Sequence, residues 1–231
     1  MAIDFPTLFI LLAIAASLYL AYSKQKIDLS AVVSTGIVGG ICLIAGGMLW
    51  ITPLFIFFVL GSMVSGYKRT FKKKVGVEQS IRTYRNVFSN GGAAAIFALM
   101  YLFIENELYF IGLMGAMATA MADTSATELG QVYGKHPRLI LNMKKVPLGT
   151  PGGVSKQGLL FSLLGSGIIS SLLFIWGYDV AIFTVVLISG FVGALIDSLL
   201  GASIERKGYI DTHMVNLIAT IMGGSLAMIM S

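Results

Sequence analysis

Charge, cysteine and histidine are all scarce in this sequence, and each shortage excludes a class of protein. Only 12% of the 231 residues are Asp, Glu, Lys or Arg, whereas soluble domains average about a quarter. We therefore expect no soluble domain that carries a nucleic-acid-binding surface. The single Cys42 lies in an apolar run, which excludes a disulfide framework and a thiolate metal site. The two histidines show no zinc-ligand spacing.

Apolar residues, in contrast, make up 56% of the chain, and the mean hydropathy is +0.86. Apolar runs of about 20 residues recur along the sequence, and that is the length a helix needs to cross a bilayer. We therefore predict an all-α, polytopic transmembrane bundle with about eight spans. Six or seven full spans with re-entrant segments are the alternative. The predicted spans are residues 5–22, 31–47, 50–66, 91–104, 108–122, 158–176, 180–200 and 215–230.

The basic residues test this span count. All 16 Lys and Arg residues fall in the odd-numbered connections between spans. Because connections rich in Lys and Arg stay in the cytoplasm, both termini are predicted to lie outside, in an integral protein of the cell (plasma) membrane. The basic cluster at 68–74 is typical of a segment attracted to anionic lipid. The charged residues of the even-numbered connections and the termini are all acidic, and they are Asp4, Glu105, Glu107 and Asp179.

Two acidic clusters stand on spans that approach the basic side. Asp123 and Glu128 lie in MADTSATELG, and Asp197 and Glu205 lie in GALIDSLLGASIE. A carboxylate within a span costs about 2.5–3.5 kcal/mol on insertion scales and is a functional candidate by default. Two such Asp residues would repel unless a cation lay between them, and Mg²⁺ binds through one or two carboxylates plus substrate phosphates. The polar and small neighbours that share these clusters are Thr124, Ser198 and Gly201.

Other interpretations of these acidic residues stay open. Asp123 and Asp197 are alternatively structural partners of Arg85 or of a lysine. Glu205 is alternatively a solvated helix end. Gly201, one helical turn after Asp197, would let another backbone or a ligand come close to that carboxylate.

A glycine-rich loop, KKVPLGTPGGVSK, follows the first acidic cluster. Glycines in such a loop can expose several backbone N–H groups to an anion, and the start of the next span would add a positive helix end. The loop is not a Walker A sequence, because G-x-x-x-x-G-K-[ST] is absent. A plain flexible loop is the alternative. The candidate phosphate-binding residues here are Lys144, Lys145, Gly149, Thr150, Gly152, Gly153, Ser155 and Lys156.

A polar stretch, RNVFSNGG, precedes the fourth predicted span. Asn86 and Asn90 are four residues apart, so both amides share one face if the helix has already begun. With Arg85 they form a further candidate phosphate-binding group on the basic side.

Four stretches in this order, NVFSNGGAAA, ATAMADTSATELG, VPLGTPGGVS and GALIDSLLGAS, resemble one family of membrane proteins. The family was long catalogued as a domain of unknown function, and it includes the phytyl-phosphate kinases of plants and cyanobacteria. The resemblance covers about residues 80–218. Where family members often have an aromatic residue or Leu, this chain has Ser125, and Pro151 replaces an Asn in the glycine-rich loop. Pro151 removes one possible N–H donor.

The resemblance implies transfer of a phosphoryl group from a nucleoside triphosphate, with CTP as a candidate donor, to an isoprenyl monophosphate, giving the diphosphate. Phosphoryl transfer depends mostly on positioning and charge neutralisation, and a phosphomonoester acceptor with a second pKa of about 6 needs no strong general base. We treat residues 1–231 as one transmembrane domain, with N-terminal spans over 1–66 and the proposed catalytic core over 67–231. The implied partners are a nucleoside triphosphate, an isoprenoid lipid phosphate and the membrane, and no nucleic acid.

On this hypothesis Asp123 and Asp197 hold Mg²⁺, with Glu128 as a further ligand or a supporting group. Lys145 is assigned with the two Asp residues to catalysis. The remaining candidates bind phosphate, and the isoprenyl chain lies between glycine-lined spans. The rival hypotheses are an ion-coupled membrane transporter and another lipid-phosphate transferase.

Overall fold

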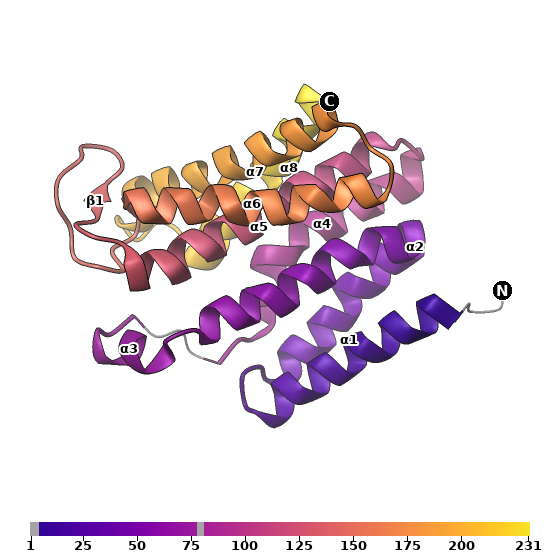
Figure 1. Ribbon diagram of the computed structural model, residues 1–231, viewed down its shortest axis with the longest axis horizontal. Helices are drawn as coiled ribbons and strands as arrows, with labels where there is room; N and C mark the ends of the chain where they lie inside the picture. The colour runs from indigo at the N-terminus through magenta and orange to yellow at the C-terminus, as the bar shows by residue number, and fades with distance from the viewer. Residues whose placement is uncertain (1–4, 78–80) are drawn as a thin grey trace.

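The computed structural model describes residues 5–77 and 81–231 (Figure 1). The described chain is mostly helical, as predicted. A short antiparallel pair of strands, β1 (Arg138–Leu139) and β2 (Gly153–Val154), pairs Arg138 with Val154. The helices are α1 (Phe5–Ser23), α2 (Leu29–Gly66), α3 (Arg69–Lys74), α4 (Tyr84–Ile104), α5 (Leu108–Tyr133), α6 (Lys156–Ile175), α7 (Val180–Leu200), the π-helix η1 (Gly201–Glu205) and α8 (Thr212–Met230).

Several helices begin at a polar residue that caps the first turn. The carboxylates of Asp28, Asp179 and Asp211 accept hydrogen bonds from backbone N–H groups at 2.8, 3.0 and 3.0 Å, at the starts of α2, α7 and α8. Ser155 accepts from the N–H of Gly158 at 3.1 Å and caps α6. These bonds satisfy backbone donors that have no partner inside the helix.

Every predicted span coincides with a helix or with half of one. Five helices, α2, α4, α6, α7 extended through η1, and α8, are long and apolar enough to cross a membrane, and the described part of α1 adds a shorter apolar helix over Leu11–Ser23. The second and third predicted spans are the two halves of α2. They meet at Gly46 and Gly47, whose backbone is not helical, and Gly47 has φ of 64°, which favours glycine.

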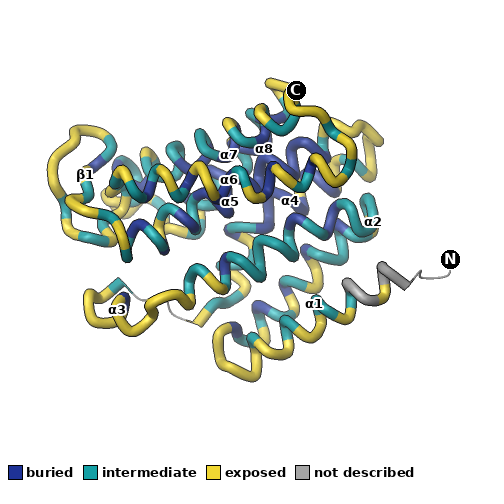
Figure 2. Tube along the Cα trace, viewed as in Figure 1, coloured by how far each residue is buried: buried dark blue, intermediate teal, exposed yellow. Residues whose placement is uncertain are grey.

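Helix α5 is the centre of the bundle, packed against α2, α4, α6, α7 and α8. All residues from Phe110 to Ala122 are buried (Figure 2). Many of them are Gly or Ala, which allows helices to approach closely. A methyl group at Gly115, for example, would lie 2.8 Å from the carbonyl oxygen of Gly223 on α8. Helix α5 also extends to Tyr133, well beyond the predicted end at residue 122, so MADTSATELG is helical throughout.

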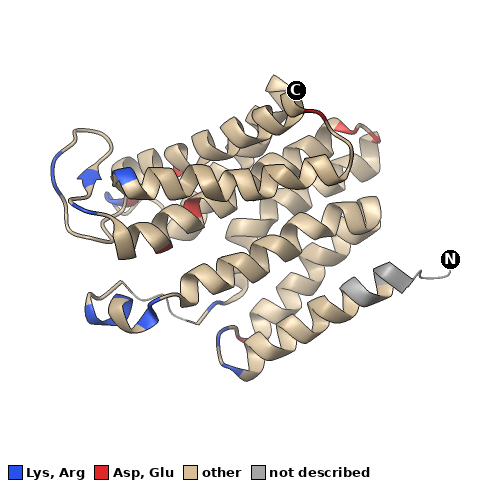
Figure 3. Cartoon of the chain, in the orientation of Figure 1, with Lys and Arg blue, Asp and Glu red and all other residues tan. Residues whose placement is uncertain are grey.

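The two ends of the bundle differ in charge. Lys and Arg gather at one end, and acidic residues stand at the other end, where α4 meets α5 and α6 meets α7 (Figure 3). These acidic residues cap the helix ends there and are Glu105, Glu107 and Asp179. We call the end with Lys and Arg the basic end. Asp4, which was predicted to share the acidic end, lies outside the described residues. The helical arrangement therefore reproduces the alternation of connections that the sequence predicted.

Candidate functional site

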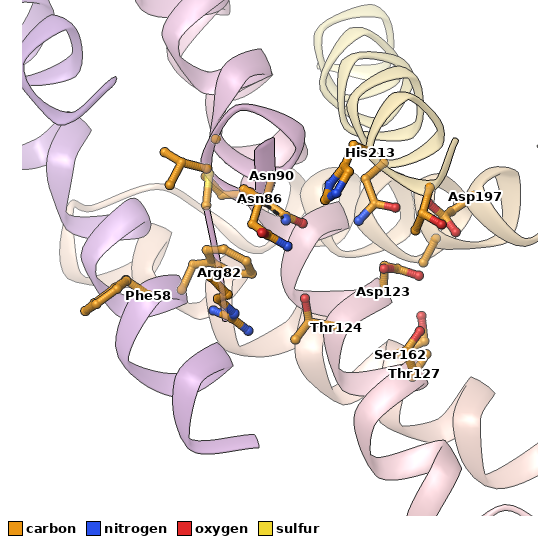
Figure 4. Close-up of a pocket in the computed structure, with 18 of the residues that line it drawn as sticks. Phe58, Arg82, Asn86, Asn90, Asp123, Thr124, Thr127, Ser162, Asp197 and His213 are labelled. Atoms are coloured by element: carbon orange, nitrogen blue, oxygen red, sulfur yellow. Dashed lines mark hydrogen bonds between the residues drawn. The ribbon is translucent and has the colours of Figure 1, made fainter. Parts of the chain in front are cut away.

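One cavity of about 570 Å³ connects the polar residues of the basic end with the apolar residues of α1 and α2. This volume is in the range of small-molecule sites in proteins. Its polar part contains Asp123, Asp197, Asn86 and Arg82 (Figure 4). The glycine-rich loop lines the same part. Its apolar part is formed mainly by the two halves of α2. The cavity therefore has the shape of a site for an amphiphile with a polar head.

Asp123 on α5 and Asp197 on α7 face the same part of the cavity (Figure 4). Their carboxyl groups are close enough to hydrogen-bond if one of them carries a proton. Asp123 lies about 22 Å along α5 from its start at Leu108, at 1.5 Å per residue. The two acidic clusters that the sequence singled out thus meet in the folded chain.

Side chains of α8 bond to both acidic residues of the second cluster, Asp197 and Glu205. With its side-chain amide oriented to satisfy both polar atoms, Asn216 donates to Oδ2 of Asp197 at 3.1 Å and to the carbonyl of Thr212 at 2.8 Å. Glu205 lines the cavity from η1 and accepts a hydrogen bond from the hydroxyl of Thr212. Helix α8 therefore fixes both acidic groups of the second cluster. Residues of a π-helix are frequently found at functional sites.

The glycine-rich loop packs directly on this π-helix. Gly152 has φ of 72°, and a side chain there would collide with the backbone of Ala202. In the same contact, a methyl group at Gly201 would lie 2.9 Å from the nitrogen of Gly152. Gly201 thus admits another backbone beside the Asp197 helix, as the sequence suggested. Within the loop, the N–H groups of Thr150 and Gly153 are used in turns, with bonds of 3.3 and 2.9 Å.

Arg82 enters the cavity from the segment before α4 (Figure 4). Its Nη2 donates to Oγ of Ser65 at 2.6 Å, which anchors it to α2. Burial lowers the pKa of the Arg82 guanidinium, and the nearby Glu128 carboxylate opposes this shift. The guanidinium nevertheless keeps its charge, because arginine is not deprotonated in proteins. Among the residues that the structure describes, Arg82 is the one Lys or Arg in the cavity lining.

Asn86 and Asn90 both lie on the first turns of α4 and both line the cavity (Figure 4). Asn86 accepts from the N–H of Thr83 at 2.9 Å in a capping box. Asn90 donates to the carbonyl of Asn86 at 2.9 Å. The helix has therefore begun before Asn86, and the two amides share one face, as the four-residue spacing predicted.

The structure brings most of the predicted site residues to the cavity and leaves six outside its lining. Those in the lining are Asn86, Asn90, Asp123, Thr124, Gly149, Thr150, Gly152, Gly153, Ser155, Asp197 and Ser198. Those outside it are Arg85, Glu128, Lys144, Lys145, Lys156 and Gly201.

The residues outside the lining have other surroundings. The three lysines of the loop are exposed. Arg85 forms an exposed ion pair with Asp211. Glu128 is buried in an ion pair with Lys72, whose Nζ also donates to the carbonyls of Val64 and Ser65 at 3.1 and 3.0 Å. Glu128 is thus occupied by a cation of the protein itself, which favours the supporting role over the ligand role.

A magnesium ion would fit the pair Asp123 and Asp197 on the chemistry of the donor set, which is two carboxylates facing one polar cavity. Within residues 5–77 and 81–231, no group of three or more His, Cys, Asp or Glu residues is arranged to hold a metal. Substrate phosphates would therefore have to complete the coordination.

Several lining residues did not emerge from the sequence. Arg82 is one of seven bases between the third and fourth predicted spans, and nothing in its spacing distinguishes it. Ser162 is an isolated hydroxyl in an apolar run, yet its Oγ is buried in the cavity wall and has no hydrogen-bond partner among the described residues. Asn216 and His213 also line the cavity. In the sequence they follow Asp211 in a pattern typical of a helix start. Only their position in three dimensions reveals them.

Comparison with known proteins shows the family. Residues 12–224 match the family described as integral membrane protein DUF92, and the chain belongs to it. It is similar to an uncharacterized membrane protein, MJ0933, of Methanocaldococcus jannaschii, with 34% identity over 96% of this chain and 93% of that protein. It is also similar to two Arabidopsis thaliana proteins. Protein PGR is 29% identical over 82% of this chain and 75% of its own length. The chloroplastic protein VTE6 is 27% identical over 75% of this chain and 56% of its own length. No solved structure matches the chain.

This family is the one that the sequence motifs indicated. The protein is therefore an integral membrane protein of that family.

Proposed function

We propose that this protein transfers a phosphoryl group from a nucleoside triphosphate to an isoprenyl monophosphate of the phytyl or geranylgeranyl type, and releases the isoprenyl diphosphate. The observation that carries this proposal is the single cavity that joins a carboxylate-bearing polar part to an apolar part. A substrate with a phosphate head and a hydrocarbon tail matches both parts.

The polar part supports the chemistry of phosphoryl transfer. Asp123 and Asp197 would hold Mg²⁺, which neutralises phosphate charge when it is bound. Arg82 supplies a fixed positive charge in the same cavity, and a guanidinium binds phosphate oxygens through paired N–H donors. Asn86 and Asn90 add amide groups from one helix face. The loop from Gly149 to Ser155 closes the cavity on the side of η1.

The reaction needs little proton transfer. An oxygen of the acceptor monophosphate attacks the terminal phosphorus of the triphosphate, the bond to the bridging oxygen breaks, and the nucleoside diphosphate leaves. The acceptor oxygen is already ionised near neutral pH. The protein therefore has to position two anions side by side and neutralise them, and the described residues suit that task.

The test is a matrix of the four nucleoside triphosphates against phytyl, geranylgeranyl and farnesyl phosphate, with purified protein in lipid nanodiscs and Mg²⁺. We expect the isoprenyl diphosphate and a nucleoside diphosphate in equal amounts, and no product when the metal is chelated. Absence of turnover with every pair would refute the kinase. Release of pyrophosphate with a nucleotide-linked lipid would instead indicate a nucleotidyltransferase.

Variants of the two aspartates sharpen this test. Asp123→Asn and Asp197→Asn should each lower kcat by about a hundredfold or more, because each removes one of two charges assigned to the metal. Asp179→Asn is the matched control, since Asp179 caps the opposite end of α7 and Asn is an equally good cap. Full activity in both cavity variants would overturn the metal assignment.

We also propose that the basic end faces the cytoplasm of the cell membrane, because all Lys and Arg residues gather there (Figure 3). A cysteine introduced at Glu105 should react with a membrane-impermeant maleimide on intact cells, and one at Lys145 should react only after lysis. The reverse pattern would invert the topology.

A further inference from the structure

The apolar part of the cavity is built largely by one folded helix. The two halves of α2 run side by side, and both contribute lining residues at several depths. Depth is measured here along each half from its end at the basic side, at about 1.5 Å per residue. From shallow to deep, the lining residues used here are Gly36, Gly40 and Leu43 on the first half, and Phe58, Phe55 and Ile51 on the second.

These three levels lie at about 10–12, 16 and 21–23 Å from the basic end. The hydrocarbon core of a bilayer is about 30 Å thick, so the chamber reaches about two thirds of the way across. Helix α1 adds Leu11, Ile14 and Leu18 to its wall. An elongated apolar chamber of this depth suits a hydrocarbon chain held parallel to the helices.

Two glycines create the space. A methyl group at Gly36 or at Gly40 would meet no atom within 4 Å. In contrast, one at Gly39, on the neighbouring position, would already touch Ile51 at 3.6 Å. The open volume beside Gly36 and Gly40 belongs to the same cavity that holds Asp123 and Arg82. At its polar part this cavity also contains the buried hydroxyl of Ser162, which lacks a partner among the described residues.

We infer that this chamber binds the isoprenyl chain of the acceptor and that Gly36, Gly40 and Leu43 determine the longest chain accepted. The inference rests on the proposed function for the identity of the head group. A chain whose phosphate lies beside Asp123 and Arg82 extends past Gly36 first, then Gly40, and reaches Leu43 only if it is long. Residues at increasing depth therefore act on chains of increasing length.

The experiment compares Gly36→Leu, Gly40→Leu and Leu43→Ala with geranyl, farnesyl and geranylgeranyl phosphate as acceptors. Gly40→Leu should lower kcat/KM for geranylgeranyl phosphate about tenfold or more relative to geranyl phosphate, because a blocked hydrocarbon segment loses its burial. Gly36→Leu should impair all three. Leu43→Ala should raise the relative rate with an acceptor one isoprene unit longer, a gain that misfolding cannot produce.

Ile37→Phe is the matched control, because Ile37 lies next to Gly36 on α2, is 51% exposed and does not line the cavity. It should leave the chain-length profile unchanged. Unchanged profiles in all three chamber variants would overturn the inference and leave the kinase standing.

A binding measurement separates the two proposals. The dissociation constants of geranyl and geranylgeranyl phosphate are measured without nucleotide, for the parent protein and for Gly40→Leu. If the parent shows no turnover but Gly40→Leu selectively weakens the longer ligand, the chamber stands and the kinase falls. If the longer ligand binds equally to both proteins, the chamber is refuted.

Discussion

Glycine has opposite uses in the two parts of this molecule. In the bundle of α4 to α8, glycines bring backbones together, as where Gly115 of α5 meets Gly223 and Gly224 of α8. In α2, Gly36 and Gly40 face open space. The first arrangement makes a rigid frame that holds the carboxylates, and the second leaves a chamber. The same residue type therefore signals close packing or a cavity, depending on what lies opposite.

The largest expected effect is a loss of stability when the contact between the N-terminal part and the bundle is broken. Lys72 on α3 is fully buried against Glu128 on α5 and joins the N-terminal part to the bundle. Lys72→Met should lower the free energy of unfolding by about 3–5 kcal/mol, because it leaves a buried carboxylate without its partner. Lys73→Met, on the exposed side of the same helix, should have little effect.

Thermal unfolding in detergent measures this, and a double variant completes the comparison. Lys72→Met combined with Glu128→Leu should be less destabilised than the sum of the two single changes. Simple additivity would mean that the ion pair does not couple the two parts.

The next largest effect is expected on activity, and it compares an arginine in the cavity, Arg82, with an arginine on the surface, Arg85. Arg82→Gln should lower kcat/KM about a hundredfold, or about 2.7 kcal/mol, because it removes a positive charge from the cavity. Arg85→Gln should change it less than about threefold, since the Arg85–Asp211 pair is exposed. Steady-state kinetics decide, and a larger loss for Arg85 would restore the assignment that was made from the sequence.

The two uses of glycine can be compared by the same change, Gly to Ala, at one position of each kind. Gly115→Ala should destabilise the protein by about 1–3 kcal/mol, because the added methyl group meets the backbone of α8. Gly36→Ala should be neutral or slightly stabilising, since the helix gains propensity and the methyl group enters open space. The midpoints of thermal unfolding report both, and equal losses would contradict the distinction.

The smallest effect concerns pH. The pKa of Asp211 is held below its ordinary value of 3.8, first by the N–H of Met214 and then by Arg85. Because the folded pKa is the lower one, this carboxylate stabilises the protein above pH 3.8 and loses that contribution as the pH falls through the folded pKa. Asp211→Asn should therefore flatten the acid side of a plot of unfolding temperature against pH. An unchanged slope would show that Asp211 does not contribute.

The helices could be predicted well because a membrane-spanning helix requires a long apolar run, which is visible in the sequence. The sequence also placed Asp123 and Asp197 on one side, since charge segregation fixes where each span ends. The prediction ended α5 too early, because Asp123 looked like the edge of a span. In the structure, neighbouring helices bury the polar continuation as far as Tyr133.

Pairings between distant segments could not be predicted from local patterns. The cluster at 68–74 looked uniformly suited to lipid head groups, and nothing local distinguishes Lys72 from its neighbours. Its role depends on Glu128, which lies far away in the sequence. The same holds for Arg82, because the hydrogen bond to Ser65 on α2 orients its side chain. The site assignments themselves remain predictions until the variants are measured.

The turn at Gly46 and Gly47 also has a consequence for biogenesis. Trp50 packs over this turn and against Tyr101 and Phe110, with ring centroids 4.7 and 5.4 Å apart. No charged residue lies between the two halves of α2, so translocating the turn moves no ion through the hydrocarbon. The two halves can therefore enter the bilayer together as a helical hairpin, whose tip carries Gly46, Gly47 and Trp50 and no hydrophilic loop.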